Sequence, residues 1–221
     1  RGSSLAPRAA HQRHRLHLGV HALAHGEPER VEAAPGDARE QSRRVLEAGR
    51  AAGLGLRVHG NQLGESGGVQ LAVEMGAASV DHVNFLADAD IEALAASPTV
   101  ATILPACDLS TRMPFAPARR LLDAGANVAI ASNCNPGTSY TSSMNFCVGT
   151  AVLQQHLTLE EALRAATLGG AFALRRTDVG TLRVGARADL HVLDAPAAIH
   201  LAYRPGMPLT HQVWRAGTRI V

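Results

Sequence analysis

Polar side chains stand at the ends of several short apolar runs, where α/β proteins place ligands and catalytic groups. His59 ends the run LRVH, with Gln62 just beyond it, and His82 lies near the end of ASVDHV. Asn133 follows the run NVAIAS. A neutral imidazole can bind zinc or ferrous iron, or transfer protons near pH 7. The pattern predicts a metal site or an acid–base site, and two structural histidines are the alternative.

The segment ASNCNPGTS contains a second group of candidate residues. Asn135 and the following Pro-Gly favour a tight turn, and Gly137 lets backbone amides approach a ligand closely. We expect Thr138 and Ser139 where the next helix begins, a position that suits an anionic group. An ordinary strand-to-helix turn with an N-cap explains the same residues equally well.

These residues need elements that bring strand ends together, and the chain alternates short apolar runs with helical patterns. We predict strands at 56–59, 78–83, 99–104 and 127–132, which recur every 20 to 29 residues. Helices are expected at 41–52, 69–75, 89–97 (capped by Asp88), 117–125 and 160–174, the last opened by a capping box of Thr158 and Glu161. Strand–loop–helix units of this size are typical of a parallel sheet.

The expected fold class is therefore α/β, in the form of a partial (β/α)8, TIM-like barrel. Four such units make half of a barrel that typically takes about 250 residues. We predict an irregular, poorly ordered segment over 1–36, the partial barrel over 37–176, and a small β-rich appendage, sandwich-like, over 177–221 with a hairpin at Ala216-Gly217. The barrel strands should be apolar on both faces, with Val58, Val80 and Ile103 toward the interior.

Composition excludes several classes of protein. Of the 221 residues 46% are hydrophobic and 18% charged, which is typical of a globular domain. No apolar run approaches the roughly 20 residues of a membrane-spanning helix. An aromatic content of 3% and a net charge of +2 argue against nucleic-acid partners. Three isolated cysteines and the lack of a signal-peptide core predict a cytoplasmic protein.

Histidines also recur at spacings of 3, 3, 4 and 4 near the start of the chain, at His11, His14, His17, His21 and His25. On a helix they would form one stripe that could bind a transition metal. Gly19, Gly26 and Pro28 oppose a helix there. We therefore expect an irregular remnant of a truncated N-terminal half.

Two long runs carry a resemblance to a known family. LRVHGNQLGESGGVQLAVEMGAASVDHVNFL and ATILPACDLSTRMP, followed by LLDAGANVAIASNCNPGTSYTSSM, resemble imidazolonepropionases, which are metal-dependent cyclic-amide hydrolases of the amidohydrolase superfamily. The final GTLRVGARADLHVLDAP is similar to the small β-domain of that superfamily. HLGVHAL resembles the family's Gly-Ala-His-Ala segment. The resemblance implies hydrolysis of 4-imidazolone-5-propanoate to N-formimidoyl-L-glutamate in histidine degradation, with zinc or iron as cofactor.

The resemblance also implies a role for each matching residue. His59 would be a metal ligand, and Asn133 stands where the family usually has an aspartate ligand. His82 would be the acid–base histidine, and Gln62 would act beside the substrate ring in catalysis and binding. The remaining substrate contacts would come from His21, Asn135, Gly137 and Thr138.

Two departures from the family keep alternatives open. The family's His-x-His pair on the first barrel strand has no match in this sequence, and the side chain of Asn133 is a neutral amide. The chain would then be a truncated C-terminal part that is inactive alone. It could instead be a non-catalytic fragment, a homo-oligomer or assembly partner that depends on the missing barrel half, or a related hydrolase of another cyclic amide.

Overall fold

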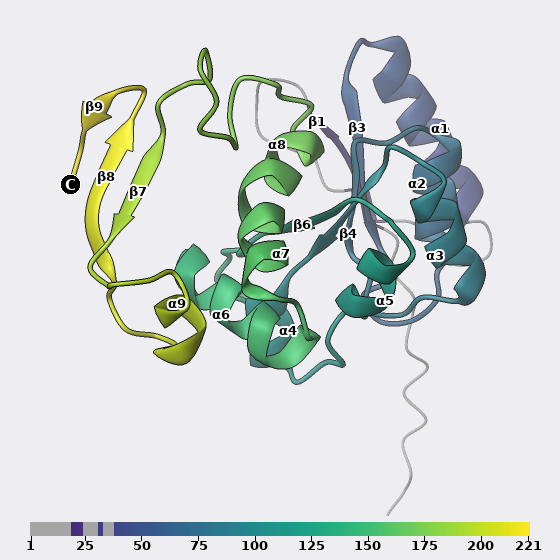
Figure 1. Ribbon diagram of the computed structural model, residues 1–221. Helices are drawn as coiled ribbons and strands as arrows, with labels where there is room; N and C mark the ends of the chain where they lie inside the picture. Colours follow the sequence, from purple (N-terminus) through teal and green to yellow (C-terminus); the bar gives the residue numbers. More distant parts are fainter. Residues whose placement is uncertain (1–18, 24–30, 33–37) are drawn as a thin grey trace, which may run out of the picture.

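A computed structural model describes residues 19–23, 31–32 and 38–221 (Figure 1). It contains a six-stranded sheet in the order β2-β1-β3-β4-β5-β6 and a three-stranded sheet in the order β7-β8-β9. The larger sheet comprises β1 (Gly19–Leu23), β2 (Val31–Glu32), β3 (Gly55–Gly60), β4 (Ser79–His82), β5 (Val100–Ile103) and β6 (Val128–Ile130). The smaller comprises β7 (Leu190–Leu193), β8 (Thr210–Arg215) and β9 (Thr218–Arg219).

Helices lie between many of the strands, in both sheets. They are α1 (Ala38–Ala51), α2 (Gly68–Glu74), α3 (Asp88–Ala95), α4 (Pro105–Thr111), α5 (Ala118–Asp123), α6 (Met144–Gln155), α7 (Leu159–Arg164), the π-helix η1 (Ala165–Gly169), α8 (Gly170–Ala173) and α9 (His200–Tyr203). Strands β3 to β6 are parallel neighbours. The α/β class and the four predicted strands are therefore confirmed. Among the described residues the sheet is open, with β2 and β6 at its ends.

The first part of the chain differs from the prediction of an irregular segment over 1–36. β1 pairs antiparallel with β3 along its whole length, from Gly19 opposite His59 to Leu23 opposite Gly55. The apolar run GVHAL forms a strand because it can pair with the otherwise unpaired edge of β3. The helical histidine stripe is wrong at His21, which lies in β1. The stripe's other histidines lie outside the described residues.

The expectation of strands apolar on both faces is wrong for β3 and β4, whose two faces differ in polarity, and it holds for β6, where Val128, Ala129 and Ile130 are all buried. Leu56, Val58 and Val80 are buried in the core that the sheet forms with its helices. The alternate positions of β3 and β4 carry Arg57, His59, Ser79 and Asp81 on the opposite face. The valines and Ile103 thus face the helices and not a barrel interior. Part of the second face packs on α8, where Val100, Ala129 and Ala173 form a small cluster.

The first residues of the helices show where local sequence patterns were enough to predict a helix start. The capping box of α7 is confirmed, because Thr158 accepts from the backbone of Glu161 and Glu161 accepts from the backbone of Thr158. The prediction for α3 is off by one position, since Ala87 is the N-cap and Asp88 begins the helix. No helix was predicted between residues 104 and 117, where α4 lies. Its first residue is Pro105, which suits the first turn of a helix but ends helices elsewhere.

Glu161 joins this cap to a neighbouring helix and should make stability depend on pH. Arg119 donates two hydrogen bonds to its carboxylate, at 2.8 and 2.9 Å. These bonds, and then that from the Thr158 backbone, lower the pKa of Glu161 to about 2. A lowered carboxyl pKa gives stability that is present above the ordinary pKa of 4.5 and lost as pH falls toward 2. We expect Glu161→Gln to reduce the free energy of unfolding by about 1–2 kcal/mol at pH 7, after allowance for solvent screening.

Urea unfolding of both proteins from pH 7 to pH 3 measures this effect. The difference should shrink by more than half between pH 5 and pH 3. The control Asp123→Asn removes the more exposed partner of Arg119, 65% exposed, and should have a much smaller effect. A difference that stays constant with pH would contradict the role given to Glu161.

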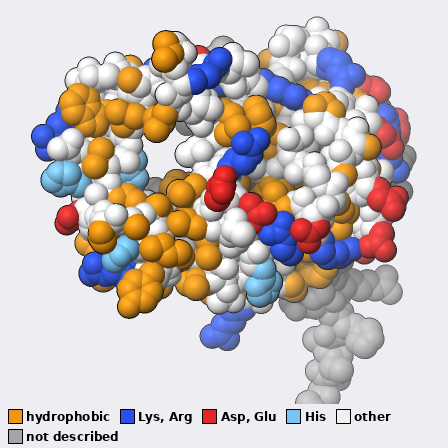
Figure 2. Space-filling view, viewed as in Figure 1, with side chains coloured by type: hydrophobic (Ala, Val, Ile, Leu, Met, Phe, Trp, Pro, Cys, Tyr) orange, Lys and Arg blue, Asp and Glu red, His pale blue; other side chains and the backbone are white. Residues whose placement is uncertain are grey.

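The C-terminal sheet is a meander in which β7 pairs with β8 and β8 with β9, all antiparallel. The predicted hairpin is confirmed, with Ala216 and Gly217 both at positive φ as a two-residue turn requires. One three-stranded sheet is described, so the sandwich-like form and the domain boundary at 177 remain predictions. Figure 2 shows hydrophobic side chains exposed around this sheet and α9. Leu182, Val184 and Tyr203 are among the exposed hydrophobic residues of this part of the chain. No helix among the described residues is long and apolar enough to cross a membrane.

Candidate functional site

Two histidines meet at the carboxyl ends of adjacent strands, as the sequence pattern predicts. Gly60 at the end of β3 lies opposite His82 at the end of β4. The rings of His59 and His82 are 4.1 Å apart between centroids and inclined by 34°. His82 is 2% exposed, and His59 is half-buried. The parallel register therefore brings residues 23 positions apart into contact at one end of the sheet.

The backbone at these strand ends is strained. Asn61, His82, Val83 and Asn133 all have positive φ, between 50° and 84°. This region suits glycine, and it is unusual for a β-branched residue such as Val83. Each such residue costs on the order of 1–3 kcal/mol and persists only where surrounding contacts fix it. Positive φ at the ends of three parallel strands is consistent with the candidate site at this edge of the sheet.

Gln62 lies beside His59 rather than apart from it. Its Oε1 is 2.7 Å from His59 Nε2, and its Nε2 is 4.0 Å from the Sγ of Cys107 on α4. With the amide in this orientation, Oε1 accepts and His59 Nε2 carries the proton. The imidazole must release this hydrogen bond before Nε2 can bind a metal.

The loop after β6 binds mainly to itself. Asn135 Oδ1 accepts from the backbone amides of Gly137 and Thr138, both at 2.8 Å, and Asn135 Nδ2 donates to the carbonyl of Asn133 at 2.6 Å. The predicted turn is thus present, and Asn135 holds it closed. The expectation that Thr138 and Ser139 begin a helix is wrong, because α6 begins at Met144 with Ser143 as its N-cap. Asn133 is half-buried at the start of this turn.

The predicted residues fall into two groups. His59, Gln62 and His82 lie together at the ends of β3 and β4, while Asn133, Asn135, Gly137 and Thr138 follow β6, two strands away. The backbone of His21 lies in β1 opposite Arg57, two residues from His59, and its side chain is outside the described part of the structure.

The polar face of the sheet carries a chain of hydrogen bonds that sequence reasoning missed. We call it the polar ladder. Arg57 donates to the Ser79 hydroxyl at 2.8 Å and to the carbonyl of Ala173, and Ser79 donates to Asp81 at 2.9 Å. Thr102 lies opposite Asp81, and its buried hydroxyl has no hydrogen-bond partner among the described residues. Only the alternation of polar and apolar residues in RVHG and SVDH could have indicated this ladder.

Buried amides and carboxylates fix the loops behind the histidines. Asn61 donates to the carbonyl of Phe85 at 2.8 Å and accepts from the backbone of Ser66 at 3.2 Å. Asn84 donates to Asp108 Oδ1 at 2.7 Å. Asn61 therefore supports the loops structurally. The pair of Asn84 and Asp108 had no sequence signal, because its members lie on separate elements.

Asp108 should give the protein a second pH dependence, opposite in sign to that of Glu161. Burial raises its pKa from 3.8 to about 6, against the hydrogen bonds from Asn84 and the Ala116 backbone, which lower it. A carboxyl group with a raised pKa favours the folded state when it is protonated. Its stabilising effect is present below about pH 4 and lost as pH rises to 6. Asp108→Asn should remove this loss, which is on the order of 2–3 kcal/mol.

Urea unfolding of wild type and Asp108→Asn between pH 4 and pH 7.5 measures the effect. We expect the variant to gain stability relative to wild type over this range. A difference between the two proteins that is flat with pH would show that Asp108 does not titrate there.

A metal site is not complete in the described part of the chain. No three His, Cys, Asp or Glu side chains there are placed to hold a metal ion. A catalytic zinc normally has three protein ligands. His59 is engaged with Gln62, and the amide of Asn133 is a weaker donor than a carboxylate. The residues present therefore do not by themselves fit the predicted zinc or iron.

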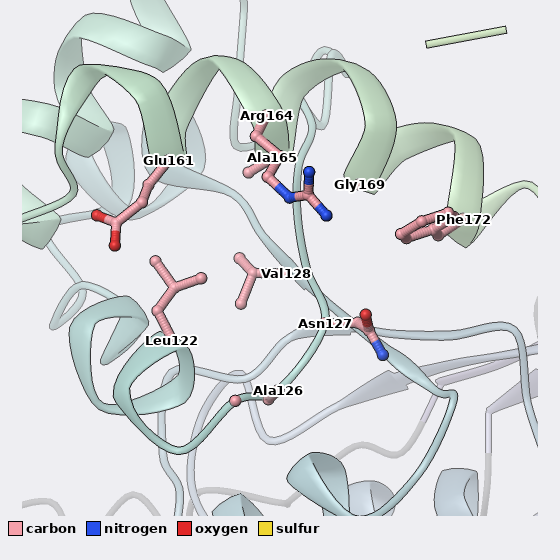
Figure 3. Close-up of a pocket in the computed structure, with 10 residues that line it drawn as sticks. Leu122, Ala126, Asn127, Val128, Glu161, Arg164, Ala165, Gly169 and Phe172 are labelled. Atoms are coloured by element: carbon pink, nitrogen blue, oxygen red, sulfur yellow. The ribbon is translucent and has the colours of Figure 1, made fainter. Parts of the chain in front are cut away.

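A cavity of about 210 Å³ lies away from this site, at the amino end of β6. Figure 3 shows the polar side chains of Glu161, Arg164 and Asn127 around it, together with Leu122, Val128 and Phe172. It is separated from the histidines by the length of the strands.

The fold and the strand-end residues together define an α/β protein whose polar site lies at the carboxyl edge of a parallel sheet. Residues 9–220 match the Amidohydrolase family, and the chain belongs to this family. The imidazolonepropionase of Micrococcus luteus is 71% identical over 196 residues, which cover 82% of this chain and 49% of that protein. That of Arthrobacter sp. strain FB24 is 66% identical over 199 residues, covering 81% and 50%. These relatives confirm the predicted resemblance, and the chain spans about half the length of the curated relatives it matches.

Solved structures agree on the fold. An adenosine deaminase from Xanthomonas campestris with bound zinc has a TM-score of 0.70 and 25% identity, covering 82% of this chain and 48% of that one. Atrazine chlorohydrolase TrzN from Arthrobacter aurescens TC1, complexed with zinc, has a TM-score of 0.71 and 22% identity over 86% and 49%.

Proposed function

We propose that this chain forms part of a metal-dependent hydrolase that converts 4-imidazolone-5-propanoate to N-formimidoyl-L-glutamate. The observation that carries this proposal is the 71% identity to the imidazolonepropionase of Micrococcus luteus over 82% of the chain. The contact between His59 and His82 at the strand ends supports it independently, because paired imidazoles there suit metal binding and proton transfer.

In this reaction the oxygen of water adds to the ring carbonyl carbon, the bond from that carbon to the ring nitrogen breaks, and the nitrogen takes up a proton. We assign the proton transfer to His82, which would accept the proton of the attacking water and deliver it to the departing nitrogen. The imidazole of His82 is buried at this strand end. Gln62 would contact the substrate ring once its amide leaves His59.

The loop after β6 would bind the substrate's propionate. Its internal hydrogen bonds support a preorganised role, because Asn135 already fixes Gly137 and Thr138 before any ligand arrives. Under this proposal Asn135 shapes the loop, while Gly137 and Thr138 offer backbone or hydroxyl groups to the substrate. His21 would approach the same edge from β1.

A zinc or iron ion is the proposed cofactor, and it would supply a bound water of lowered pKa. The zinc-containing structures of similar fold support zinc more than iron. This chain would offer His59 and Asn133 to the ion. The other metal ligands would have to come from outside the described residues. The half of the relatives that this chain does not span would supply them.

A hybrid protein tests the proposal. Residues 38–221 of this chain replace the matching half of the Micrococcus luteus relative, and turnover of 4-imidazolone-5-propanoate is followed by loss of its ultraviolet absorbance. We expect hydrolysis above that of a hybrid carrying His82→Ala. A well-folded hybrid that binds zinc and shows no turnover would refute the assigned reaction, and turnover of another cyclic amide alone would reassign the substrate.

A second candidate function is a non-catalytic member that binds the ligand without hydrolysing it. The neutral Asn133 and the incomplete ligand set among the described residues favour it. Binding of the substrate without turnover would support this candidate. A homo-oligomer, or association with the remaining barrel half, would cover the open edge of β6, and the cytoplasm remains the proposed location.

A further inference from the structure

We infer that Asn84 and Asp108 are positioning residues that fix the orientation of His82. Together with the carbonyl of Pro114 we call them the Asn84 clamp. The inference rests on the proposed function only for the proton-transfer role of His82. The clamp itself is a structural arrangement that can be tested in this chain without any substrate.

The clamp lies one residue beyond the most strained part of the site. His82 and Val83 have φ values of 84° and 51°, so the chain leaves β4 in a conformation that neither side chain favours. Such a conformation is retained only where neighbouring contacts leave no relaxed alternative. If the backbone relaxed at Val83, the imidazole of His82 would turn with it.

Asn84 provides such contacts with the Nδ2 of its side-chain amide, whereas its buried Oδ1 has no hydrogen-bond partner among the described residues. Its two N–H bonds point to Asp108 Oδ1 and to the carbonyl of Pro114, both at 2.7 Å. Asn84 is 6% exposed and Asp108 is 1% exposed, so water does not compete for these bonds. The second oxygen of Asp108 accepts from the backbone of Ala116 at 3.3 Å. The carboxylate therefore joins the loop after β4 to the segment after α4.

The opposite side of the same loop is held by the end of β3. The amide of Val83 donates to the carbonyl of Gly60, and that of Phe85 donates to the carbonyl of Asn61, each at 3.1 Å. The side chain of Asn61 returns a hydrogen bond to the carbonyl of Phe85 at 2.8 Å. Residues 83–85 are thus fixed between the β3 turn on one side and α4 on the other.

General packing does not explain why a carboxylate and an amide occupy this place. Apolar residues of similar volume often stabilise an interior as well as or better than buried charged groups. Burial raises the pKa of Asp108 to about 6, which reflects an unfavourable environment for its charge. The hydrogen bonds between Asn84 and Asp108 are directional, so they can fix the backbone geometry of the neighbouring residues. Apolar contacts cannot specify that geometry, which explains why a polar pair occupies this place.

The test uses the isotopically labelled chain and its Asn84→Ala variant. Hydrogen exchange of the Val83 amide and the imidazole NMR signals of His82 are measured at pH 7. We expect the Val83 amide to exchange at least about tenfold faster in the variant, because its local opening becomes easier. The His82 ring signals should shift or broaden as the ring samples more than one orientation.

Thr99→Val is the matched control. It removes one buried hydrogen bond, from the Thr99 hydroxyl to the carbonyl of Ala77 at 3.0 Å, at the opposite end of the same sheet. It should lower the global stability without changing the His82 signals. If Asn84→Ala and Thr99→Val affected Val83 and His82 alike, the Asn84 clamp would be an ordinary structural contact and the inference would fail.

Asp108→Asn provides a second variant if Asn84→Ala does not fold. It keeps the side-chain volume and one acceptor for Asn84, and we expect a smaller change of the same kind. Unchanged His82 signals in a folded Asp108→Asn protein would overturn the inference. If the hybrid is inactive but the substitutions change Val83 exchange and the His82 signals as expected, only the proposed function is refuted. If the hybrid is active and neither substitution changes the His82 signals, only the Asn84 clamp is refuted.

Discussion

Replacing His82 with alanine in the hybrid enzyme is expected to lower kcat by about 10²–10⁴-fold, the usual contribution of general acid–base catalysis. His82 is the proposed proton carrier because its ring contacts that of His59 at the strand end, at 4.1 Å between centroids. KM should change little, since the substitution removes a proton carrier and not a substrate contact. Steady-state kinetics with 4-imidazolone-5-propanoate gives both constants.

Zinc content separates this role from that of a ligand. We expect His82→Ala to retain the metal of the parent hybrid, measured by mass spectrometry after gel filtration. His211→Ala is the control, because His211 is exposed on β8 of the C-terminal sheet. If His82→Ala lost the metal together with activity, His82 would be a ligand and the assignment of proton transfer would be wrong.

Replacing Asn133 with aspartate in the same hybrid is expected to tighten zinc binding by about tenfold or more. A carboxylate adds a negative charge and a stronger oxygen donor, whereas the amide is neutral. Tenfold corresponds to about 1.4 kcal/mol of binding free energy. Competition with a chromogenic chelator measures the affinity, and turnover should rise with metal occupancy.

Two further variants serve as controls for the zinc binding expected of Asn133→Asp. Asn133→Ala should bind zinc no better than the parent hybrid. Asn135→Asp places the same charge two residues away, at a side chain that already accepts from Gly137 and Thr138, and should not reproduce the gain. If Asn135→Asp tightened zinc binding as much as Asn133→Asp, general charge and not a ligand position would explain the effect.

The parallel strands could be predicted because their signals are local. Each is a short run that contains at least one valine and is bounded by turn residues, and the capping box before α7 lies within four residues of sequence. The contact between His59 and His82 followed from the same reasoning, since parallel neighbours place their carboxyl ends together. Helix α4 was not predicted, because a proline such as Pro105 can either begin a helix or interrupt one.

The remainder of the site depends on pairings that no local pattern encodes. Asn84 and Asp108 are 24 residues apart, and each alone reads as an ordinary polar residue. β1 became a strand because β3 offered a free edge, and its own residues carried only a weak apolar signal. The polarity of the sheet's second face was missed because the strands were expected to be buried on both sides.

The polar ladder also has a consequence for how the chain finds its fold. Side chains alternate along a strand, so a slip of one residue between β3 and β4 would exchange the two faces. Arg57 would then enter the packed interior beneath the helices without Ser79 and Asp81, and an unpaired buried charge is strongly unfavourable. Leu56 and Val58 would lose their apolar neighbours at the same time. The ladder thus favours the native register of β3 against β4 over a register shifted by one residue.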